Sequence, residues 1–567
     1  DANEFQPTEM GYHREAIFYG GESVYPFQYL DFSVKKYSED NHWLQQNKGF
    51  SIEQANAVIT SIMKIQEKAM FSHMETLKLL HPDLWTFLPP LILNINQLTE
   101  NIALEPAIIN YVLEAFTFDH KKTNEKFENM SDFNLSGSYP LIKINADEYL
   151  LFQYVDLCQA LYETPFQWMW DDKNYRKHLS EHRGRFTETI CAEKLALVFG
   201  KDKVYSNVHI IDPQSKTQNI KGEIDVLVVF ADKIIILQAK AKKLTLQAKR
   251  GNGEIIKDDF KKAVQDAYDQ GVDCAKLYID SQYKLVDSSM SELKLSRNPN
   301  QIYIFCVVLD YYPALFAQTK YFLQLENINS VLPPFVMDVF FLDVMVEFLR
   351  TPVWFLSYIN RRVNYQEKIL AQDELTILAY HLKQNLWIEG AALVYFYEDF
   401  KAEIDAAMIV RRMGYRGNPT PDGILTIFQS ATVSGFIIQL EKIETSNSIE
   451  IALLILTLDY SNVSKLSHNF GKMIELTKDN KPHDFSIILY PAKIGLTFYY
   501  CDRESVEVRI FMHDYCGIKK YQTKSNLWFG VCIDPRDNSI RFIIKLDNFW
   551  MPSLMLDEEI RLRGYSV

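Results

Sequence analysis

The chain has 567 residues, a formal net charge of −13 at pH 7, and a composition that is 47% hydrophobic and 13% aromatic. Such a chain can bury sizeable cores, which excludes an intrinsically disordered protein, and its length predicts two to four domains. The acidic balance does not indicate a general nucleic-acid-binding protein, so any contact with nucleic acid would have to be local. The sequence has no Walker A motif and gives no sign of an ATP-driven motor.

Cysteine usage and hydropathy predict the compartment. The seven cysteines are scattered without metal-type spacing and are expected to be reduced core residues. No apolar run is long enough to span a membrane, and the opening residues Asp1–Glu4 do not resemble a signal peptide. We therefore expect a cytoplasmic protein without membrane contact.

Residues 1–137 are expected to form a mainly helical region. Ser51 can cap a long helix that runs to about Leu80, with Gln54 at the capping-box position. The charged stretch 121–134 and the turn-rich residues after it predict a domain boundary near residue 138. Short strands with a turn are expected just beyond that boundary, over 141–154.

A helix with an apolar stripe is predicted over 184–200, because Gly200 is suited to end it and apolar residues recur at helical spacing. Glu188 and Glu193 lie on this helix. They are five residues apart, roughly 140° around the helix axis, so both cannot face the same point. A strand over 204–211 should follow.

The central feature of the chain is a β-hairpin over 222–240. Both arms are rich in Val, Ile and Leu, which suit a pleated and largely buried surface, and the turn is expected at Ala231–Asp232. If Phe230 pairs with Lys233 across that turn, the antiparallel register of the whole hairpin is fixed.

Polar residues stand at the end of the hairpin away from the turn. The register places Asp225 opposite Gln238, and the alternation of side chains puts Gln238 and Lys240 on one face. Burying such groups is costly unless they are paired or bind a metal, so their convergence predicts a site. The alternative interpretation is a buried hairpin that merely has polar ends.

The segment after the hairpin is locally basic, with nine Lys and Arg residues against three acidic ones over 233–262. This patch suits a phosphate backbone, although a solvated loop and helix face would look the same. The candidate contacts with nucleic acid are Lys242, Lys243, Lys249 and Arg250. A helix is predicted over 257–269.

The remaining elements are predicted from hydrophobic pattern. A central strand is expected over 301–310, another over 333–343, and then helices over 344–364 and 371–387. Residues 395–567 should form a separate α+β domain with a helix over 396–413 and a segment, 435–459, that suits a strand or a helix equally. Further strands are expected over 485–490, 494–500, 506–512, 528–533 and 540–546.

An acidic residue followed about a dozen residues later by a strand-borne Gln-Ala-Lys resembles the PD-(D/E)XK nuclease superfamily, in its Mrr-like and NERD-like branch. The resemblance is strongest over 184–275. It implies an α/β (α+β multidomain) protein in which residues 138–390 form a restriction-endonuclease-like mixed sheet flanked by helices. It also implies that Asp225 is the main metal ligand, that Gln238 occupies the second acidic position and that Lys240 is the catalytic lysine.

The same resemblance suggests further site residues. The helix before the hairpin contributes a glutamate to the metal in this superfamily; Glu188 is preferred, with Glu193 as the alternative. Glu223 is an additional candidate ligand, and Gln265 and Tyr268 resemble auxiliary elements near the site. A neutral Gln238 brings one less negative charge than a glutamate would, which predicts weaker metal binding unless another acidic residue compensates.

The implied function is Mg²⁺-dependent hydrolysis of DNA, with Mn²⁺ as a substitute, because hard oxygen ligands suit these ions. By analogy the protein would be a bacterial anti-phage defence nuclease with an activating partner or phage-derived trigger, and it could form a homo-oligomer. Two alternatives remain: a catalytically inactive scaffold with the nuclease fold, and a ribonuclease that uses Arg176 and His182, whose spacing is similar to that of HEPN ribonucleases.

Overall fold

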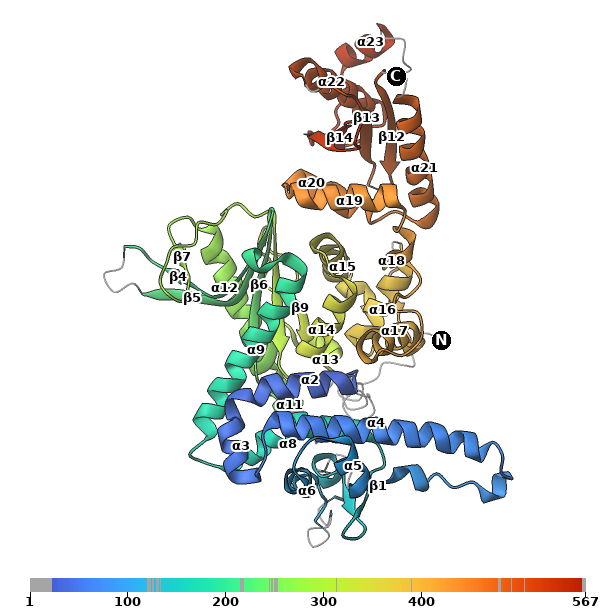
Figure 1. Cartoon of the computed structure of the whole chain (residues 1–567). Coiled ribbons are helices and arrows are strands. Elements are labelled where there is room, and N and C mark those ends of the chain that lie inside the picture. Colours follow the sequence, from blue (N-terminus) through green and yellow to red (C-terminus); the bar gives the residue numbers. More distant parts are fainter. Residues whose placement is uncertain are drawn as a thin grey trace, which may run out of the picture.

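The computed structural model describes residues 23–119, 124, 127–128, 132, 134–214, 219–243, 245, 248, 253–312, 314–388, 390–477, 481–490, 492–503 and 505–562. The chain is a mixed α/β protein with a helical N-terminal region and a six-stranded mixed sheet. A four-stranded mixed sheet lies towards the C-terminus, and the three regions follow one another along the length of the molecule (Figure 1). Within the described residues, no helix is long and apolar enough to cross a membrane.

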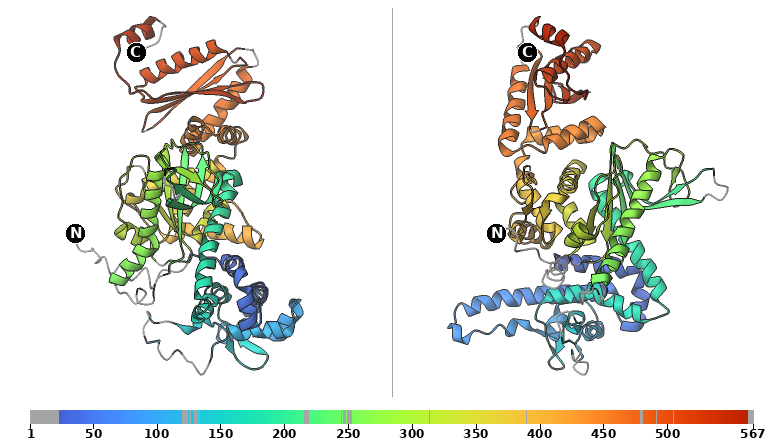
Figure 2. Two further views of the ribbon diagram at one scale, coloured as in Figure 1. Left: turned by 90° about the vertical axis from the view of Figure 1, so that its left-hand side faces the viewer. Right: turned by 180° about the vertical axis from the view of Figure 1, so that it is seen from behind.

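The N-terminal region is built around the long helix α4 (Ile52–Leu77). Ser51 and Gln54 form the predicted capping box, since Ser51 Oγ accepts the Gln54 amide and Gln54 Oε1 accepts the Ser51 amide. The right-hand view of Figure 2 shows α4 reaching outward from the body of the protein. Of the predicted linker 121–134, only residues 124, 127–128, 132 and 134 are described.

The other elements of this region pack around α4 or complete a small three-stranded sheet of order β1-β3-β2. Their bounds are α2 (Pro26–Tyr37), α3 (Asn41–Lys48), β1 (Ile92–Asn94), α5 (Ile95–Asn101), α6 (Pro106–Ala115), α7 (Leu135–Ser138), β2 (Ile142–Lys143), β3 (Glu148–Leu150) and α8 (Tyr154–Asp171).

The six-stranded sheet has the order β7-β4-β5-β6-β8-β9. Neighbours from β7 to β6 are antiparallel, whereas β6, β8 and β9 run parallel to one another. The helix α9 covers one face and α12 the other (Figure 1), so the strands are apolar on both sides. The bounds are α9 (Arg176–Phe199), β4 (Val204–Ile211), β5 (Ile220–Phe230), β6 (Lys233–Lys240), α11 (Gly253–Phe260), α12 (Asp266–Ile279), β7 (Lys284–Val286), β8 (Gln301–Val308), α13 (Leu315–Phe322) and β9 (Phe335–Asp338).

Helices after β9 close one side of this sheet. The predicted strand 333–343 is shorter than expected, because the Asp338 side chain accepts the Phe341 amide at 2.8 Å and starts α14 (Val339–Phe348). The predicted helix 344–364 is therefore two helices, and Pro352 occupies the first turn of α15 (Pro352–Asn364).

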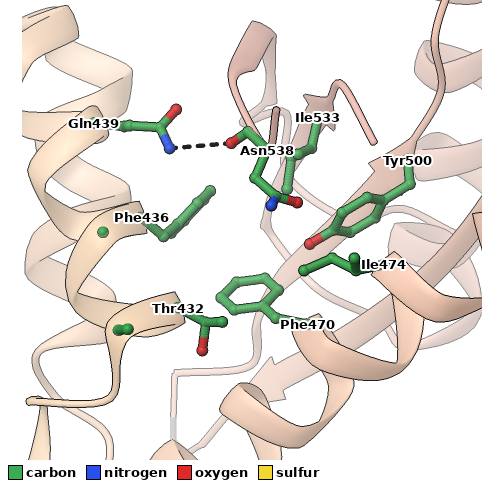
Figure 3. A pocket seen from close by; sticks show the side chains of 10 residues that line it. Thr432, Phe436, Gln439, Phe470, Ile474, Tyr500, Ile533 and Asn538 are labelled. Atoms are coloured by element: carbon green, nitrogen blue, oxygen red, sulfur yellow. Dashed lines mark hydrogen bonds between the residues drawn. The ribbon is translucent and has the colours of Figure 1, made fainter. Parts of the chain in front are cut away.

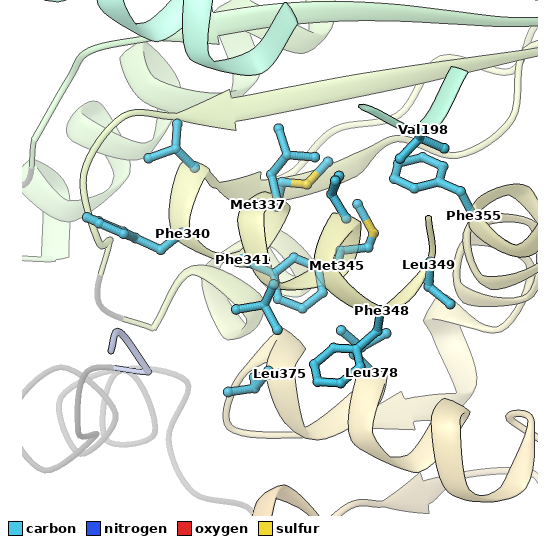
Figure 4. Packing of buried hydrophobic residues seen from close by; sticks show 14 of the residues in the cluster. Val198, Met337, Phe340, Phe341, Met345, Phe348, Leu349, Phe355, Leu375 and Leu378 are labelled. Carbon is cyan, nitrogen blue, oxygen red and sulfur yellow. The ribbon is translucent and has the colours of Figure 1, made fainter. Parts of the chain in front are cut away.

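Residues of β9, α14, α15 and α16 (Glu374–Gln384) interdigitate in a dense apolar cluster (Figure 4). The helices and strands that follow, before the C-terminal region begins at α19, are β10 (Ile369–Leu370), β11 (Val394–Tyr395), α17 (Lys401–Met413) and α18 (Ile424–Ile427).

The C-terminal region has a sheet of order β12-β13-β14-β15, in which β13 and β14 are parallel and joined by α22. The predicted strand 506–512 is wrong: it is the first part of α22 (Val506–Gln522), whose start is capped by Ser505 accepting the Val508 amide at 3.3 Å. The undecided segment 435–459 is helical. The bounds are α19 (Ala431–Ile443), α20 (Ser446–Ile455), α21 (Tyr460–Leu476), β12 (His483–Leu489), β13 (Ile494–Tyr500), β14 (Leu527–Ile533), β15 (Ile540–Leu546) and α23 (Leu554–Leu562).

The three regions are joined by packing and by ion pairs. One buried apolar cluster extends from Phe27 to Ile533 and crosses both expected domain boundaries. The hairpin turn also contacts the C-terminal region, where Ser446 Oγ donates to Asp232 Oδ2 at 2.5 Å. Close by, Lys203 Nζ lies 2.6 Å from Glu444 Oε1. The turn end of the hairpin therefore faces α20, and its polar end lies at the opposite edge of the sheet.

Candidate active site

The hairpin has the register that the sequence predicts. Pairing runs from Phe230 and Lys233 at the turn to Val226 and Leu237. Beyond that pair the ladder is continued by a side chain, because Asp225 Oδ2 accepts the backbone amide of Ala239 at 2.7 Å. This hydrogen bond holds the Asp225 carboxylate against β6, and only 9% of Asp225 is exposed.

Gln238 and Lys240 both contact α12, as expected for alternate residues of one strand. Gln238 Nε2 donates to the backbone oxygen of Glu223 at 2.8 Å, and Lys240 Nζ donates to Gln270 Oε1 at 3.0 Å. The helix can approach closely because Gly271 has no side chain; a Cβ there would lie 2.7 Å from a methyl group of Ile304.

Gln270 joins these groups into one network. Its Nε2 donates to the backbone oxygen of Glu223 at 3.3 Å while its Oε1 accepts from Lys240, so it fixes the lysine relative to β5. The sequence analysis did not identify Gln270, because it ended the predicted helix at Asp269. Cys274, one turn further along α12, also contacts the Glu223 backbone oxygen, at 3.3 Å.

Glu188 reaches the same end of the hairpin from α9. Burial, and then the charges of Asp225 and Glu223, raise the pKa of Glu188 to about 7. Burial raises the pKa of Asp225 to about 6, against the opposing effects of the Ala239 amide and the Lys240 charge. The other glutamate of the helix, Glu193, instead forms an ion pair with Lys35 of α2. The charge of Asp225 therefore disfavours the charged form of Glu188.

The residues present are suited to a hard divalent cation. Gln238 is fully buried, and its Oε1 has no hydrogen-bond partner among the described residues, which leaves one neutral oxygen donor at the same end of the hairpin as Asp225. Within the described part of the chain, no group of three His, Cys, Asp or Glu side chains is arranged to hold a metal ion. Mg²⁺ does not require such a group, since it commonly uses one or two carboxylates and completes its shell with water and phosphate.

Three other candidate residues, Glu223, Gln265 and Tyr268, direct their side chains to other partners. Glu223 directs its carboxylate to His209, with Oε1 3.5 Å from Nε2. Gln265 and Tyr268 hydrogen-bond to the segment 324–326, with Gln265 Nε2 3.0 Å from the Gln324 oxygen and Tyr268 Oη 2.9 Å from the Glu326 amide. No hydrogen bond connects either side chain with Asp225, Gln238 or Lys240 among the described residues.

The basic candidates are engaged by carboxylates. Lys242 Nζ lies 3.1 Å from Asp259, and Lys243 Nζ lies 3.7 Å from Asp310 and 3.9 Å from Glu163. Lys249 and Arg250 lie outside the described residues.

Arg176 and His182 do not meet in a catalytic arrangement. Arg176 Nε donates to the backbone oxygen of Trp170 at 2.5 Å. His182 Nδ1 lies 2.6 Å from Oδ1 of the buried Asp40, and its Nε2 is 3.8 Å from Glu39. Both side chains tie helices of the N-terminal region to the start of α9.

A second buried carboxylate lies at the same edge of the sheet. Asp310 follows β8, whose neighbour Leu309 donates its amide to the Lys240 oxygen at 3.0 Å. Asp310 accepts from Lys36 Nζ at 3.0 Å and from Arg183 Nη2 at 2.6 Å. Burial acts to raise the pKa of Asp310, but the charges of Lys243, Lys36 and Arg183 hold it well below its usual range.

The chain matches no protein-family model, no curated protein and no solved structure. Its function has to be inferred from its own residues.

Proposed function

We propose that this protein is a metal-dependent nuclease that hydrolyses DNA phosphodiester bonds, with a restriction-endonuclease-like core over the six-stranded sheet. The observation that carries the proposal is the polar end of the hairpin, where a buried carboxylate, a buried amide and an amine are gathered at the end of an apolar sheet. Charges collected in this way are a mark of functional sites. The choice of DNA comes from the resemblance to Mrr-like and NERD-like nucleases.

The arrangement of elements supports the same proposal. The helix α9 is followed by the antiparallel strands β4, β5 and β6, then by α11 and α12, and, after the short edge strand β7, by β8, which lies parallel to β6. This order is the one expected for the core of the resembled superfamily. It brings α9 and its Glu188 to one face and α12 and its Gln270 to the other.

Each residue has a separate role in the proposed reaction. Asp225 and Glu188 would hold Mg²⁺, with Gln238 Oε1 as a neutral donor. When bound, the ion would polarise the phosphate and lower the pKa of a coordinated water. Lys240 carries a positive charge that can orient the attacking water or stabilise the charge that develops on the phosphate oxygens. Gln270 positions the Lys240 amine through the 3.0 Å hydrogen bond.

One observation favours a second candidate, a non-catalytic scaffold. Gln238 donates its amide to the Glu223 backbone, and no three-residue cluster of His, Cys, Asp or Glu is formed in the described segments. A scaffold of this kind could still bind nucleic acid, but it would gain nothing from an amine held beside two carboxylates.

The test is cleavage of plasmid and linear DNA with Mg²⁺ or Mn²⁺. We expect cutting that EDTA abolishes and that Lys240→Ala slows by about 100-fold or more. The matched control is Lys284→Ala, which removes an exposed lysine from β7 of the same sheet and should leave the rate unchanged. Cutting that is equally fast in Lys240→Ala would contradict the assigned site, and binding without cutting would favour the scaffold.

A further inference from the structure

The C-terminal region contains a partly enclosed cavity of about 190 Å³ that is remote in sequence from the hairpin site. It lies between α19 and α21 on one side and the ends of β13 and β14 on the other (Figure 3). The turn that joins β14 to β15 closes it through Asn538. Nothing in the proposed nuclease chemistry uses this space.

The walls of the cavity are aromatic and aliphatic. Phe436 of α19 and Phe470 of α21 have ring centroids 5.2 Å apart with planes inclined at 47°. Ile474 and Ile533 continue the apolar lining. A cavity of about 150 Å³ with such a lining holds a benzene ring in a protein interior, so this one is large enough for a slightly larger aromatic molecule.

Four polar side chains line the cavity: within the described residues, Thr432 and Gln439 hydrogen-bond to other residues, whereas Tyr500 and Asn538 do not. Tyr500 is only 2% exposed, and its hydroxyl forms no hydrogen bond with any described residue. The side-chain amide of Asn538 is likewise without a hydrogen bond in the described part of the chain. Both side chains point into the cavity in Figure 3. The ring of Tyr500 is buried and Asn538 is exposed, and both polar groups are free to form hydrogen bonds with a polar atom of a ligand.

The position of Asn538 is fixed by the backbone. Its carbonyl accepts from Gln439 Nε2 at 3.0 Å, and its own amide donates to the Asp534 oxygen at 2.8 Å. Its backbone is left-handed, with φ of 59°, a conformation that asparagine tolerates better than most residues. The backbone of Asn538 is therefore held at the edge of the cavity, and its exposed side chain extends from that fixed point.

Gly435 leaves part of this space open. It lies in the interior of α19, where glycine destabilises a helix by about 1 kcal/mol relative to alanine. A Cβ added at Gly435 would meet no atom within 4 Å, so packing does not require a glycine there. A larger side chain at this position would instead project towards the cavity that Gly435 lines.

We propose that this cavity binds a small planar aromatic heterocycle of one or two rings, whose polar edge both donates and accepts a hydrogen bond. At the packing density of protein interiors, about 0.75, the cavity holds roughly 140 Å³ of ligand atoms, which is the size of a bicyclic compound. The ring packs against Phe436 and Phe470, and its polar edge meets the Tyr500 hydroxyl and the Asn538 amide. The proposal is independent of the nuclease proposal.

The probe pair that tests it is 7-azaindole and indole, which have the same shape. The first carries a donor and an acceptor side by side, and the second carries the donor alone. We expect the full chain to bind 7-azaindole with a Kd on the order of 0.1–1 mM and to bind indole about fivefold more weakly, as measured by calorimetric titration.

Matched glycine variants locate the binding. Gly435→Leu fills the cavity and should abolish binding of both compounds. Gly471→Leu is the control, because Gly471 lies in α21 outside the cavity and a Cβ there would also meet no atom within 4 Å. This variant should bind both compounds as the wild type does. Both variants replace a helical glycine, so melting temperatures should not fall. Tyr500→Phe keeps the ring and should remove most of the preference for 7-azaindole. Absence of 7-azaindole binding, or equal binding in the two glycine variants, would overturn the proposal.

Discussion

Two buried carboxylates stand at the same edge of the six-stranded sheet, and their surroundings are opposite. Asp310 is contacted by Lys36 and Arg183, with Lys243 nearby, and all of its charge is balanced within the fold. Asp225 forms no ion pair with a described residue, and its near neighbours include Glu188 and Glu223. Burial therefore raises the pKa of Asp225, whereas the neighbouring cations lower that of Asp310.

The comparison separates an ion-pair cluster that joins parts of the fold from the cluster that we propose as the active site. The cluster around Asp310 joins α2, α9 and the end of β8. The Asp310 carboxylate is paired there with cationic side chains of the same chain. The cluster around Asp225 is left with excess negative charge and an unpartnered Gln238 oxygen. Under the proposed function, a bound cation would offset this negative charge.

The largest expected effect in this comparison is on stability at Asp310. Asp310→Asn leaves Lys36 buried without its counter-charge and should lower the free energy of unfolding by about 3–5 kcal/mol. Asp225→Asn should not lower it, because the asparagine oxygen can still accept the Ala239 amide. Urea unfolding of both variants at pH 7 measures the two changes in the free energy of unfolding. A loss below about 1 kcal/mol for Asp310→Asn would contradict the stabilising role given to the Asp310 cluster.

The pH dependence of stability sharpens the comparison in metal-free protein. The folded-state pKa of Asp225, about 6, lies above its unfolded value, so its stabilising contribution is complete below about pH 4 and is lost as the pH rises through 6. Wild type should therefore lose about 1–3 kcal/mol relative to Asp225→Asn between pH 4 and pH 7. Urea midpoints in EDTA across this range test it; a difference that does not change with pH would show that Asp225 titrates normally.

The smallest effect is expected at Gln270. Gln270→Leu removes the acceptor of the Lys240 amine and should slow cleavage about tenfold with little change in stability. Gln270→Glu keeps an acceptor oxygen and should restore most of the rate at saturating DNA. If the leucine variant cleaves as fast as wild type, Lys240 does not depend on this hydrogen bond.

The hairpin could be predicted because its information is local. Apolar residues and a two-residue turn fix the register of the hairpin, and the structure has that register over the paired residues 226–237. The Asp310 cluster could not be predicted, because Lys36 and Asp310 are separated by 274 residues. Gln270 was missed for a local reason, since the helix continues ten residues beyond its predicted end at Asp269, to Ile279.

The error over 506–512 shows how two patterns compete. Val506, Val508 and Ile510 alternate with polar residues as in a strand, which is why a strand was expected. Ser505 caps the segment instead, and Met512 and Cys516 continue a buried helical face that packs on the C-terminal sheet. Tertiary packing over the longer helix outweighs the short alternating pattern.

The most direct test of the account is Mn²⁺ binding measured by electron paramagnetic resonance, in wild type and in Asp225→Asn. Mn²⁺ is used because it accepts the same hard oxygen ligands as Mg²⁺ and is visible to the method. The account predicts one bound ion per wild-type chain near neutral pH and a loss of that binding in the variant. No bound ion in wild type, or equal binding by both proteins, would contradict it.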